Sequence, residues 1–113
     1  MDCIFCKIIN GEIPSKKLYE DDYVYAFYDI NPQAETHFLV ISKQHICCAK
    51  EINESNSIVI AHIFEVIAKL ADELGLEGYR IINNCGKSAG QTVMHLHFHI
   101  HIFSFHLYLW HSK

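Results

Sequence analysis

The spacing of hydrophobic residues changes between two periods along the chain. Residues 18–30 alternate aromatic and small side chains, residues 37–43 are rich in residues that favour strands, and residues 79–84 return to the same character. Because the side chains of a strand point to opposite faces in turn, these stretches predict strands. The Asp21-Asp22 pair interrupts the first stretch, which predicts a hairpin there.

Residues 55–74 follow the other period, with hydrophobic side chains at steps of three and four. This spacing predicts a long helix with one apolar face. Ser55 or Asn56 can cap its start, and Gly75 can end it. The face expected to cover the sheet consists of Ile60, Ile63, Phe64, Ile67, Leu70, Ala71 and Leu74. Hydrophobic residues off this stripe indicate a second buried face: Ile58, Val59, Ala61 and Val66.

The order of these elements predicts one α+β domain over residues 1–113. A short helical turn near the N-terminus, ended by Gly11 and Pro14, precedes three strands, the long helix and two more strands. Short consecutive strands favour antiparallel pairing, and a helix with one apolar face covers one side of the sheet. We therefore expect a five-stranded, mainly antiparallel sheet with one long helix and a short N-terminal helix.

The chain carries a formal net charge of −4, and its lysines and arginines are dispersed. Without a basic stripe, we expect neither nucleic acid nor an anionic membrane surface as a partner. No stretch approaches the roughly 18 consecutive apolar residues of a membrane span, and residues 1–10 lack the apolar core of a signal peptide. These features predict a soluble, cytoplasmic protein.

Five cysteines form an odd set in which only Cys3 and Cys6 have a motif-like spacing, C-x-x-C. A disulfide scaffold is not expected from such a set. In a reducing compartment this spacing indicates half of a metal site or a redox pair, and the redox interpretation needs a preceding strand. A metal site is favoured, although two thiolates alone do not fill a tetrahedral zinc shell. The alternative is that both cysteines are simply half-buried thiols.

Residues 95–101 read HLHFHIH, with a histidine at every second position. In a strand His95, His97, His99 and His101 share one face, while the hydrophobic residues between them join the core beneath the helix. Successive residues on one face lie about 6.5–7 Å apart, so the four imidazoles extend over roughly 20 Å. A single ion therefore cannot bind all four.

Two interpretations of this row of histidines are open. One is a solvated strand face rich in histidine, as in a metal-affinity tract. The other is catalytic, because the preceding segment, residues 83–93, offers backbone donors and hydroxyls that can cradle a phosphate. A neutral imidazole is a competent nucleophile, and its neighbours can stabilise charge or donate a proton. An imidazole nucleophile beside an anion cradle predicts chemistry at a phosphate.

The same residues carry a family resemblance. HLHFHIH resembles the His-φ-His-φ-His-φ-φ signature of the histidine-triad nucleotide-binding proteins, where φ is hydrophobic, except that His101 takes the last φ position. Residues 3–46 are similar to the N-terminal half of the Hint-like branch, and residues 83–99 to its loop and catalytic strand. The combination of these segments is far more specific than the histidine pattern by itself.

The resemblance implies a hydrolase that cleaves purine nucleoside phosphoramidates at the α-phosphate through a covalent nucleotidyl-histidine. His97 matches the nucleophile, His99 holds the phosphate oxygens, His95 helps to orient the site, and His37 supports the triad. The residues that match the family's nucleotide contacts are Asp29 and Ile30 for ribose and base, and Asn84, Gly90, Gln91 and Thr92 for the α-phosphate.

The resemblance also implies a structural zinc ion and a second copy of the chain. Some bacterial members with a C-x-x-C near the N-terminus bind zinc, and the matching ligands here are Cys3, Cys6, His45 and His95. A Cys₂His₂ set is a closed, structural shell rather than a catalytic one. Hint-like proteins are homodimers with their long helices at the interface, so we expect residues 58–66 at the contact and an AMP-like nucleotide as ligand.

The resemblance ends at the tail. The family usually has a short polar tail containing glycine and arginine, whereas residues 101–113 are rich in aromatic residues and histidine. Because the tail helps to shape the nucleotide site in Hint-like dimers, two alternatives stay open. These are a nucleotide-binding regulator with vestigial catalysis and a zinc-binding interaction protein. His101 has no counterpart in the family, and we expect it to be a surface residue.

Overall fold

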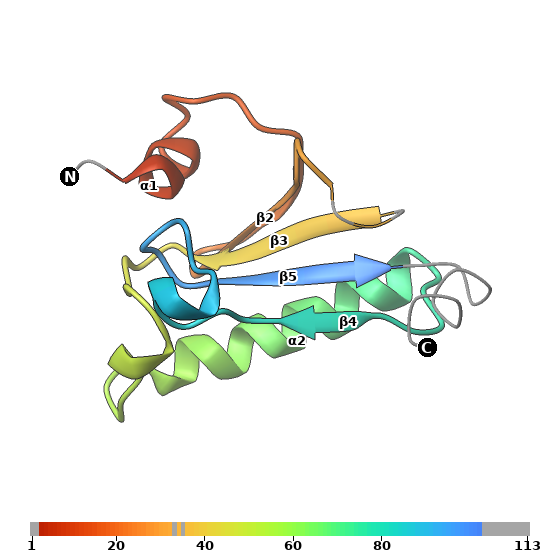
Figure 1. Ribbon diagram of the computed structural model, residues 1–113. Helices are drawn as coiled ribbons and strands as arrows, with labels where there is room; N and C mark the ends of the chain where they lie inside the picture. The colour runs from red at the N-terminus through yellow and green to blue at the C-terminus, as the bar shows by residue number, and fades with distance from the viewer. Residues whose placement is uncertain (1–2, 33, 35, 103–113) are drawn as a thin grey trace.

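The computed structural model describes residues 3–32, 34 and 36–102, and its elements follow the predicted order (Figure 1). The expectations for the tail beyond residue 102 lie outside the described residues. No helix in the described part is both long and apolar enough to span a membrane. The helices are α1 (Ile4–Ile9) and α2 (Ser57–Glu73), the strands are β1 (Lys17–Glu20), β2 (Val24–Tyr28), β3 (Thr36–Ser42), β4 (Arg80–Ile82) and β5 (His97–Ile102), and two short 3₁₀ helices are η1 (Ala49–Glu51) and η2 (Lys87–Ala89).

The five strands form one sheet in the order β1-β2-β3-β5-β4, and every neighbouring pair is antiparallel. The predicted α+β fold is therefore confirmed. β5 lies between β3 and β4, which places the histidine strand inside the sheet rather than at its edge. In this register His37 lies opposite His101, and Leu39 lies opposite His99. Side chains of these four residues consequently share one face of the sheet.

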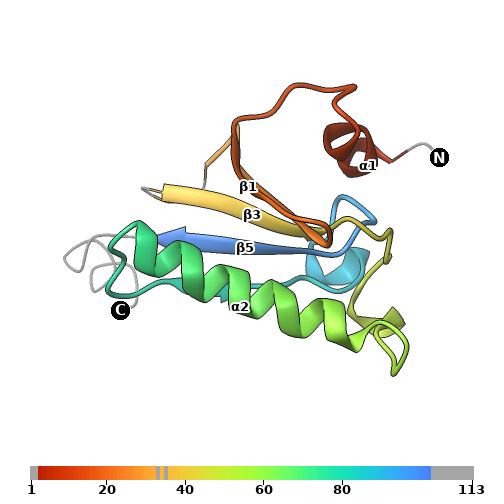
Figure 2. The same ribbon diagram turned by 180° about the vertical axis from the view of Figure 1, so that it is seen from behind.

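Both faces of the sheet are covered, each by one helix. α2 crosses one face (Figure 2) and packs on alternate residues of the strands, such as Val40 and Phe98. α1 contributes Phe5 and Ile8 to a smaller cluster on the other face, together with Leu39. The histidines face α1 rather than α2, because they alternate along β5 with the residues that pack against α2.

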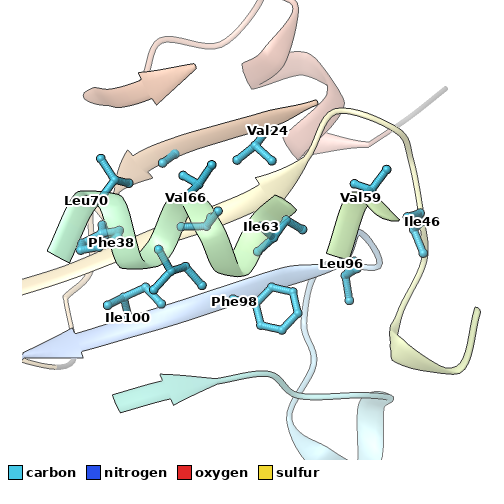
Figure 3. Packing of buried hydrophobic residues seen from close by; sticks show 13 residues of the cluster. Val24, Phe38, Ile46, Val59, Ile63, Val66, Leu70, Leu96, Phe98 and Ile100 are labelled. Atoms are coloured by element: carbon cyan, nitrogen blue, oxygen red, sulfur yellow. The ribbon is translucent and has the colours of Figure 1, made fainter. Parts of the chain in front are cut away.

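The face of α2 toward the sheet is rotated from the one we expected. Val59 and Val66, expected on a second face, belong to the core, and Val66 is only 2% exposed (Figure 3). Phe64, expected in the core, is 45% exposed. The expectation was wrong at these positions because the helix carries two overlapping hydrophobic stripes, and spacing alone does not say which one faces the sheet. The buried stripe is Val59, Ile63, Val66, Ile67, Leu70 and Ala71.

Asp21 closes the turn between β1 and β2 and fastens this hairpin to α2. Its Oδ1 atom accepts hydrogen bonds from the backbone N–H groups of Tyr23 and Val24, at 2.8 and 2.9 Å. Its Oδ2 atom lies 2.6 Å from Nε2 of His62 on α2. Burial alone would raise the pKa of Asp21, but these hydrogen bonds, that of His62 first among them, hold the pKa at about 2. The predicted hairpin is confirmed.

Candidate active site

His95 and His97 lie buried between the sheet and α1. His95 is fully buried, His97 is 5% exposed, and the ring of Phe5 on α1 meets both imidazoles edge to face at 5.8 and 5.1 Å. Leu96 and Phe98 point the other way, into the core beneath α2, as predicted. The interpretation as a solvated strand face is therefore wrong for His95 and His97, and the row of histidines lies in a partly closed site.

The hydrogen bonding of His97 decides which of its nitrogens is available. Its Nδ1 atom lies 2.6 Å from the carbonyl oxygen of His95. Because a carbonyl oxygen only accepts, Nδ1 carries the hydrogen, and the lone pair of the neutral ring is on Nε2. Burial lowers the pKa of His97, against the opposing effect of this hydrogen bond, and so favours the neutral form. His97 thus has the tautomer that a nucleophilic Nε2 requires.

His99 is held by a second histidine and a carboxylate. Nε2 of His37 lies 3.0 Å from Nδ1 of His99, and Oδ2 of Asp29 lies 3.4 Å from the same His37 nitrogen. Burial, followed by the neighbouring imidazoles, lowers the pKa of His99 to about 4. His99 is therefore neutral at pH 7, with His37 orienting its ring.

These histidines open into a cavity of about 730 Å³. Its wall includes residues of α1, the loop after β2, and the loop before β5. Ile30 lies at this cavity and is 88% exposed, which is unusual for a large hydrophobic side chain. Expected nucleotide contacts that line the cavity are Asp29, Ile30, Asn84, Gly90 and Thr92, together with His37, His97 and His99.

Gln91, also expected to contact the nucleotide, is not among the residues that line the cavity and instead holds the loop before β5 together. It is buried, its Oε1 accepts from the backbone N–H of Gly86, and its Nε2 donates to the carbonyl oxygens of Cys47 and Val93. Gly86 and Gly90 adopt positive φ values of 95° and 94°, which only glycine adopts without strain. The Gln91 side chain therefore shapes the loop. The flanking glycines were the one signal in the sequence that the loop folds tightly.

The four predicted zinc ligands converge at the start of α1. One ligand atom each from Cys3, Cys6, His45 and His95 lies within 4.8 Å of all the others, and we call this group the Cys₂His₂ cluster. The Sγ atom of Cys3 lies 3.3 Å from Nδ1 of His95, and that of Cys6 lies 3.4 Å from Nδ1 of His45. Zinc bonds of about 2.3 Å to sulfur and about 2.0 Å to nitrogen place such atoms roughly 3.6 Å apart in a tetrahedron.

The surroundings of His95 also suit a metal ligand. Its Nε2 atom lies 2.7 Å from the carbonyl oxygen of Ser42, so that Nε2 carries the hydrogen and Nδ1 offers its lone pair to the cysteines. Burial lowers the pKa of His95 to about 4, which keeps the ring in its neutral, ligating form. The residues present fit a zinc ion, and His95 is not free to act as a proton donor in the pocket.

The fold agrees with comparisons to known proteins. The HIT domain family matches residues 10–103. The chain belongs to the histidine-triad family. A solved histidine triad protein from Clostridium difficile is 53% identical, with a TM-score of 0.86 over 89% of this chain and 90% of that one.

Two further relatives extend the histidine-triad comparison. A HIT family hydrolase from Legionella pneumophila Philadelphia 1 is 43% identical, with a TM-score of 0.86 over 89% of this chain and 92% of that one. An uncharacterized HIT-like protein of Methanocaldococcus jannaschii is 47% identical over 94 residues, which are 83% of this chain and 73% of that protein. HIT family proteins generally bind nucleotides, and this chain is a hydrolase-like member of that family.

Proposed function

We propose that this protein is a hydrolase that cleaves purine nucleoside phosphoramidates, of the adenosine 5′-monophosphoramidate type, at the α-phosphate. The observation that carries the proposal is the 2.6 Å contact between Nδ1 of His97 and the carbonyl oxygen of His95. It assigns the lone pair to Nε2 of a histidine that lines a cavity of about 730 Å³, which is large enough for a nucleotide.

The reaction has two steps. Nε2 of His97 attacks the α-phosphorus, a P–N bond to the imidazole forms, and the P–N bond to the departing amine breaks as that amine takes up a proton from solvent. Water then attacks the same phosphorus and loses a proton to solvent, the bond to His97 breaks to return the neutral imidazole, and the nucleoside monophosphate leaves. The carbonyl oxygen of His95 stabilises the positive charge that the His97 ring acquires in the first step.

His99 has a supporting role in both steps. We expect it to hold the nonbridging phosphate oxygens while charge builds on them. Its partner His37, 3.0 Å away, fixes the orientation of the His99 ring, and Asp29 lies beside His37. His37 therefore acts as a positioning residue rather than on the substrate itself.

The cavity wall supports an AMP-like ligand. Asp29 can accept hydrogen bonds from ribose hydroxyls, and the exposed Ile30 offers an apolar surface that a purine base would cover. On the loop before β5, Asn84 and Thr92 offer an amide and a hydroxyl to a phosphate, and Gly90 lets the backbone approach closely.

The Cys₂His₂ cluster would hold a structural zinc ion. Four protein ligands leave no open position, so the ion contributes stability and not a step of the reaction. Cys3 and Cys6 flank the start of α1, whereas His45 and His95 belong to the segments after β3 and before β5. Zinc would therefore join α1 to the sheet and hold Phe5 over His97.

We further propose that the protein is a cytoplasmic homodimer. The described cysteines are all free thiols, which persist in a reducing compartment. On α2 Ile58 is 77% exposed, and Ala61 and the half-exposed Phe64 lie within the same two turns. With Val59 and Val66 in the core, these three residues are the apolar surface that the expected contact over residues 58–66 can use.

Turnover of adenosine 5′-monophosphoramidate to AMP and ammonia tests the proposed activity. The wild-type protein should release AMP, and His97→Ala should not, although it keeps the fold. His62→Ala is the matched control, because it removes an imidazole that lies on α2 and outside the cavity. A rise in melting temperature with AMP but without turnover would replace the hydrolase with a nucleotide-binding regulator. If AMP causes no rise in melting temperature and there is no turnover, the zinc-binding interaction protein is the function that remains.

A further inference from the structure

A second group of possible metal ligands lies at the other end of the histidine row. Among the residues that the structure describes, His37, His99 and His101 each offer a ring nitrogen within 4.8 Å of the other two, and we call them the His₃ cluster. The cluster arises from strand register, because His37 on β3 lies directly opposite His101 on β5. The rings of this pair meet at 4.2 Å between their centroids.

The geometry of the His₃ cluster suits a divalent transition-metal ion. Nε2 of His37 and Nδ1 of His99 are 3.0 Å apart, close to the roughly 3.3 Å that separates two nitrogens in a tetrahedral shell with zinc bonds of about 2.0 Å. All three histidines line the cavity, and His99 and His101 are only partly buried, which gives an ion a route in from solvent. Three imidazoles leave one coordination position for water or a ligand.

Two charged residues flank the His₃ cluster. Oδ2 of Asp29 lies 3.4 Å from Nε2 of His37, so a negative charge is next to the proposed ion. Arg80 on β4 lies opposite His101 on β5 in the register of the sheet. The carboxylate of Asp29, which lines the cavity, therefore attracts a cation to the cluster.

We propose that the His₃ cluster binds a second divalent transition-metal ion of the zinc type, separately from the Cys₂His₂ cluster. Imidazole nitrogens suit zinc, copper and nickel, whereas neither Ca²⁺ nor Mg²⁺ is expected at a site without oxygen-rich ligands. With three neutral protein ligands in place of two thiolates and two imidazoles, the ion binds more weakly than at the Cys₂His₂ cluster and exchanges with solvent. Occupancy then depends on the free metal concentration.

Binding at the His₃ cluster has a consequence for catalysis that rests on the proposed function. The ion would take one ring nitrogen of His99, the residue that we expect to hold the phosphate, and would place a positive charge beside His97, whose ring lies 4.9 Å from that of His99. An ion there would misplace the substrate phosphate. Free zinc should therefore inhibit turnover, and His101 should be required for that inhibition.

Calorimetric titration of zinc into protein whose Cys₂His₂ cluster is already loaded tests the binding. The wild-type chain should take up one further equivalent, and His101→Phe should weaken it roughly tenfold or more, since even outer-shell partners of metal ligands have effects of this size. Phenylalanine keeps the ring volume and the preference for strand but removes both nitrogens. A matched control is the His106→Ala/His111→Ala double variant, which should keep the further equivalent.

Several results would overturn the His₃ site. The first is that the wild-type chain binds no further equivalent of zinc. The second is that His101→Phe binds the further equivalent as tightly as the wild type. The third is that the His106→Ala/His111→Ala double variant loses it. If His101→Phe fails to retain its first zinc, NMR of the imidazole nitrogens in the wild-type chain decides. The further equivalent should shift the signals of His37, His99 and His101 and leave His62 unchanged, and shifts confined to His106 and His111 would contradict the site.

The inhibition is measured against each protein's own rate without added zinc. Wild-type turnover of adenosine 5′-monophosphoramidate should fall over the same zinc range as the calorimetric binding, while His101→Phe should stay active in that range. Binding of the further equivalent without any turnover would refute the proposed hydrolase and leave the metal site standing. Turnover that is insensitive to zinc in a protein that binds the further equivalent would refute the inhibition.

Discussion

His95 connects the Cys₂His₂ cluster to the proposed nucleophile His97. Its carbonyl oxygen lies 2.6 Å from Nδ1 of His97, while its own Nδ1 lies 3.3 Å from Sγ of Cys3. The ring and the backbone of one residue thus serve two sites. Leu96 anchors the same segment, since its N–H donates to the carbonyl oxygen of Ile46 at 2.6 Å. The orientation of His97 therefore depends on the position of the chain before β5.

Loss of zinc should lower stability more than the rate of the chemical step. We expect one zinc ion per chain, and Cys6→Ser should lose it together with about 2.7 kcal/mol of stability when free zinc is about 100 times its dissociation constant. Elemental analysis and thermal unfolding measure the two effects. Cys85→Ser, outside the Cys₂His₂ cluster, should keep both the zinc and the melting temperature. Wild-type protein that contains no zinc after purification without chelators would contradict the site.

The His62–Asp21 pair should make stability depend on pH. The hydrogen bond to Asp21, followed by that to Glu65, raises the pKa of His62 above 6.5 against the effect of burial, so its contribution is full below pH 6.5 and is lost as pH rises through the raised pKa. The pKa of Asp21 is lowered from 3.8 to about 2, so its contribution is full above pH 3.8 and is lost toward pH 2. The pair therefore stabilises the fold most between pH 3.8 and 6.5.

Urea unfolding of the wild type and His62→Gln at pH 5.5 and pH 9 measures this dependence. The difference in unfolding free energy between the two proteins should be up to about 1 kcal/mol at the lower pH and smaller at the higher one, as is usual for a partly exposed ion pair. Titrations common to both proteins cancel in this difference. A difference that is constant, or that grows toward pH 9, would contradict the pairing.

Gln91 should matter for the fold of the loop before β5. Gln91→Ala removes three hydrogen bonds to backbone groups of Gly86, Cys47 and Val93, and it should cost about 2–3 kcal/mol because buried polar groups lose their partners. Gln44→Ala is the matched control at an exposed position and should change stability little. Equal unfolding midpoints in urea for the two variants would show that the Gln91 amide does not hold the loop.

The proposed dimer gives a test on the exposed face of α2. Ile58→Glu should convert dimer to monomer at micromolar concentration, because it places a charge in an apolar contact. Lys50→Glu introduces the same side chain at an exposed site on η1, with a charge change of two units rather than one, and should remain dimeric. Sedimentation equilibrium reports the mass. Wild-type protein at the monomer mass of 13.1 kDa would refute the dimer.

The fold could be predicted from the sequence because its strands and long helix differ in hydrophobic period. The alternation along residues 97–102 was enough to separate the core side of β5 from the histidine side, as the burial of Phe98 confirms. The rotation of α2 could not be predicted, because Val66 and Phe64 both fit a stripe with helical spacing and only packing against the sheet selects Val66.

The residue types of the candidate site could be predicted from the sequence. The contacts between residues far apart in the sequence could not. The pairing of His37 with His101 depends on the register between β3 and β5, which no local pattern specifies. For the same reason His101, expected to be a surface residue, lies in the cavity wall. The hydrogen bond from His97 to a backbone carbonyl likewise has no sequence signature, although it determines which nitrogen is available.

Intact-mass spectrometry of the protein quenched during turnover tests the nucleotidyl-histidine most directly. Wild-type protein mixed with adenosine 5′-monophosphoramidate should gain the mass of one adenylyl group, and peptide mapping should place that group on His97. His97→Ala should gain none, and His62→Ala, whose imidazole lies outside the cavity, should react as the wild type does. Steady turnover without any adduct under rapid quenching, or an adduct on another residue, would contradict the assignment of His97 as the nucleophile.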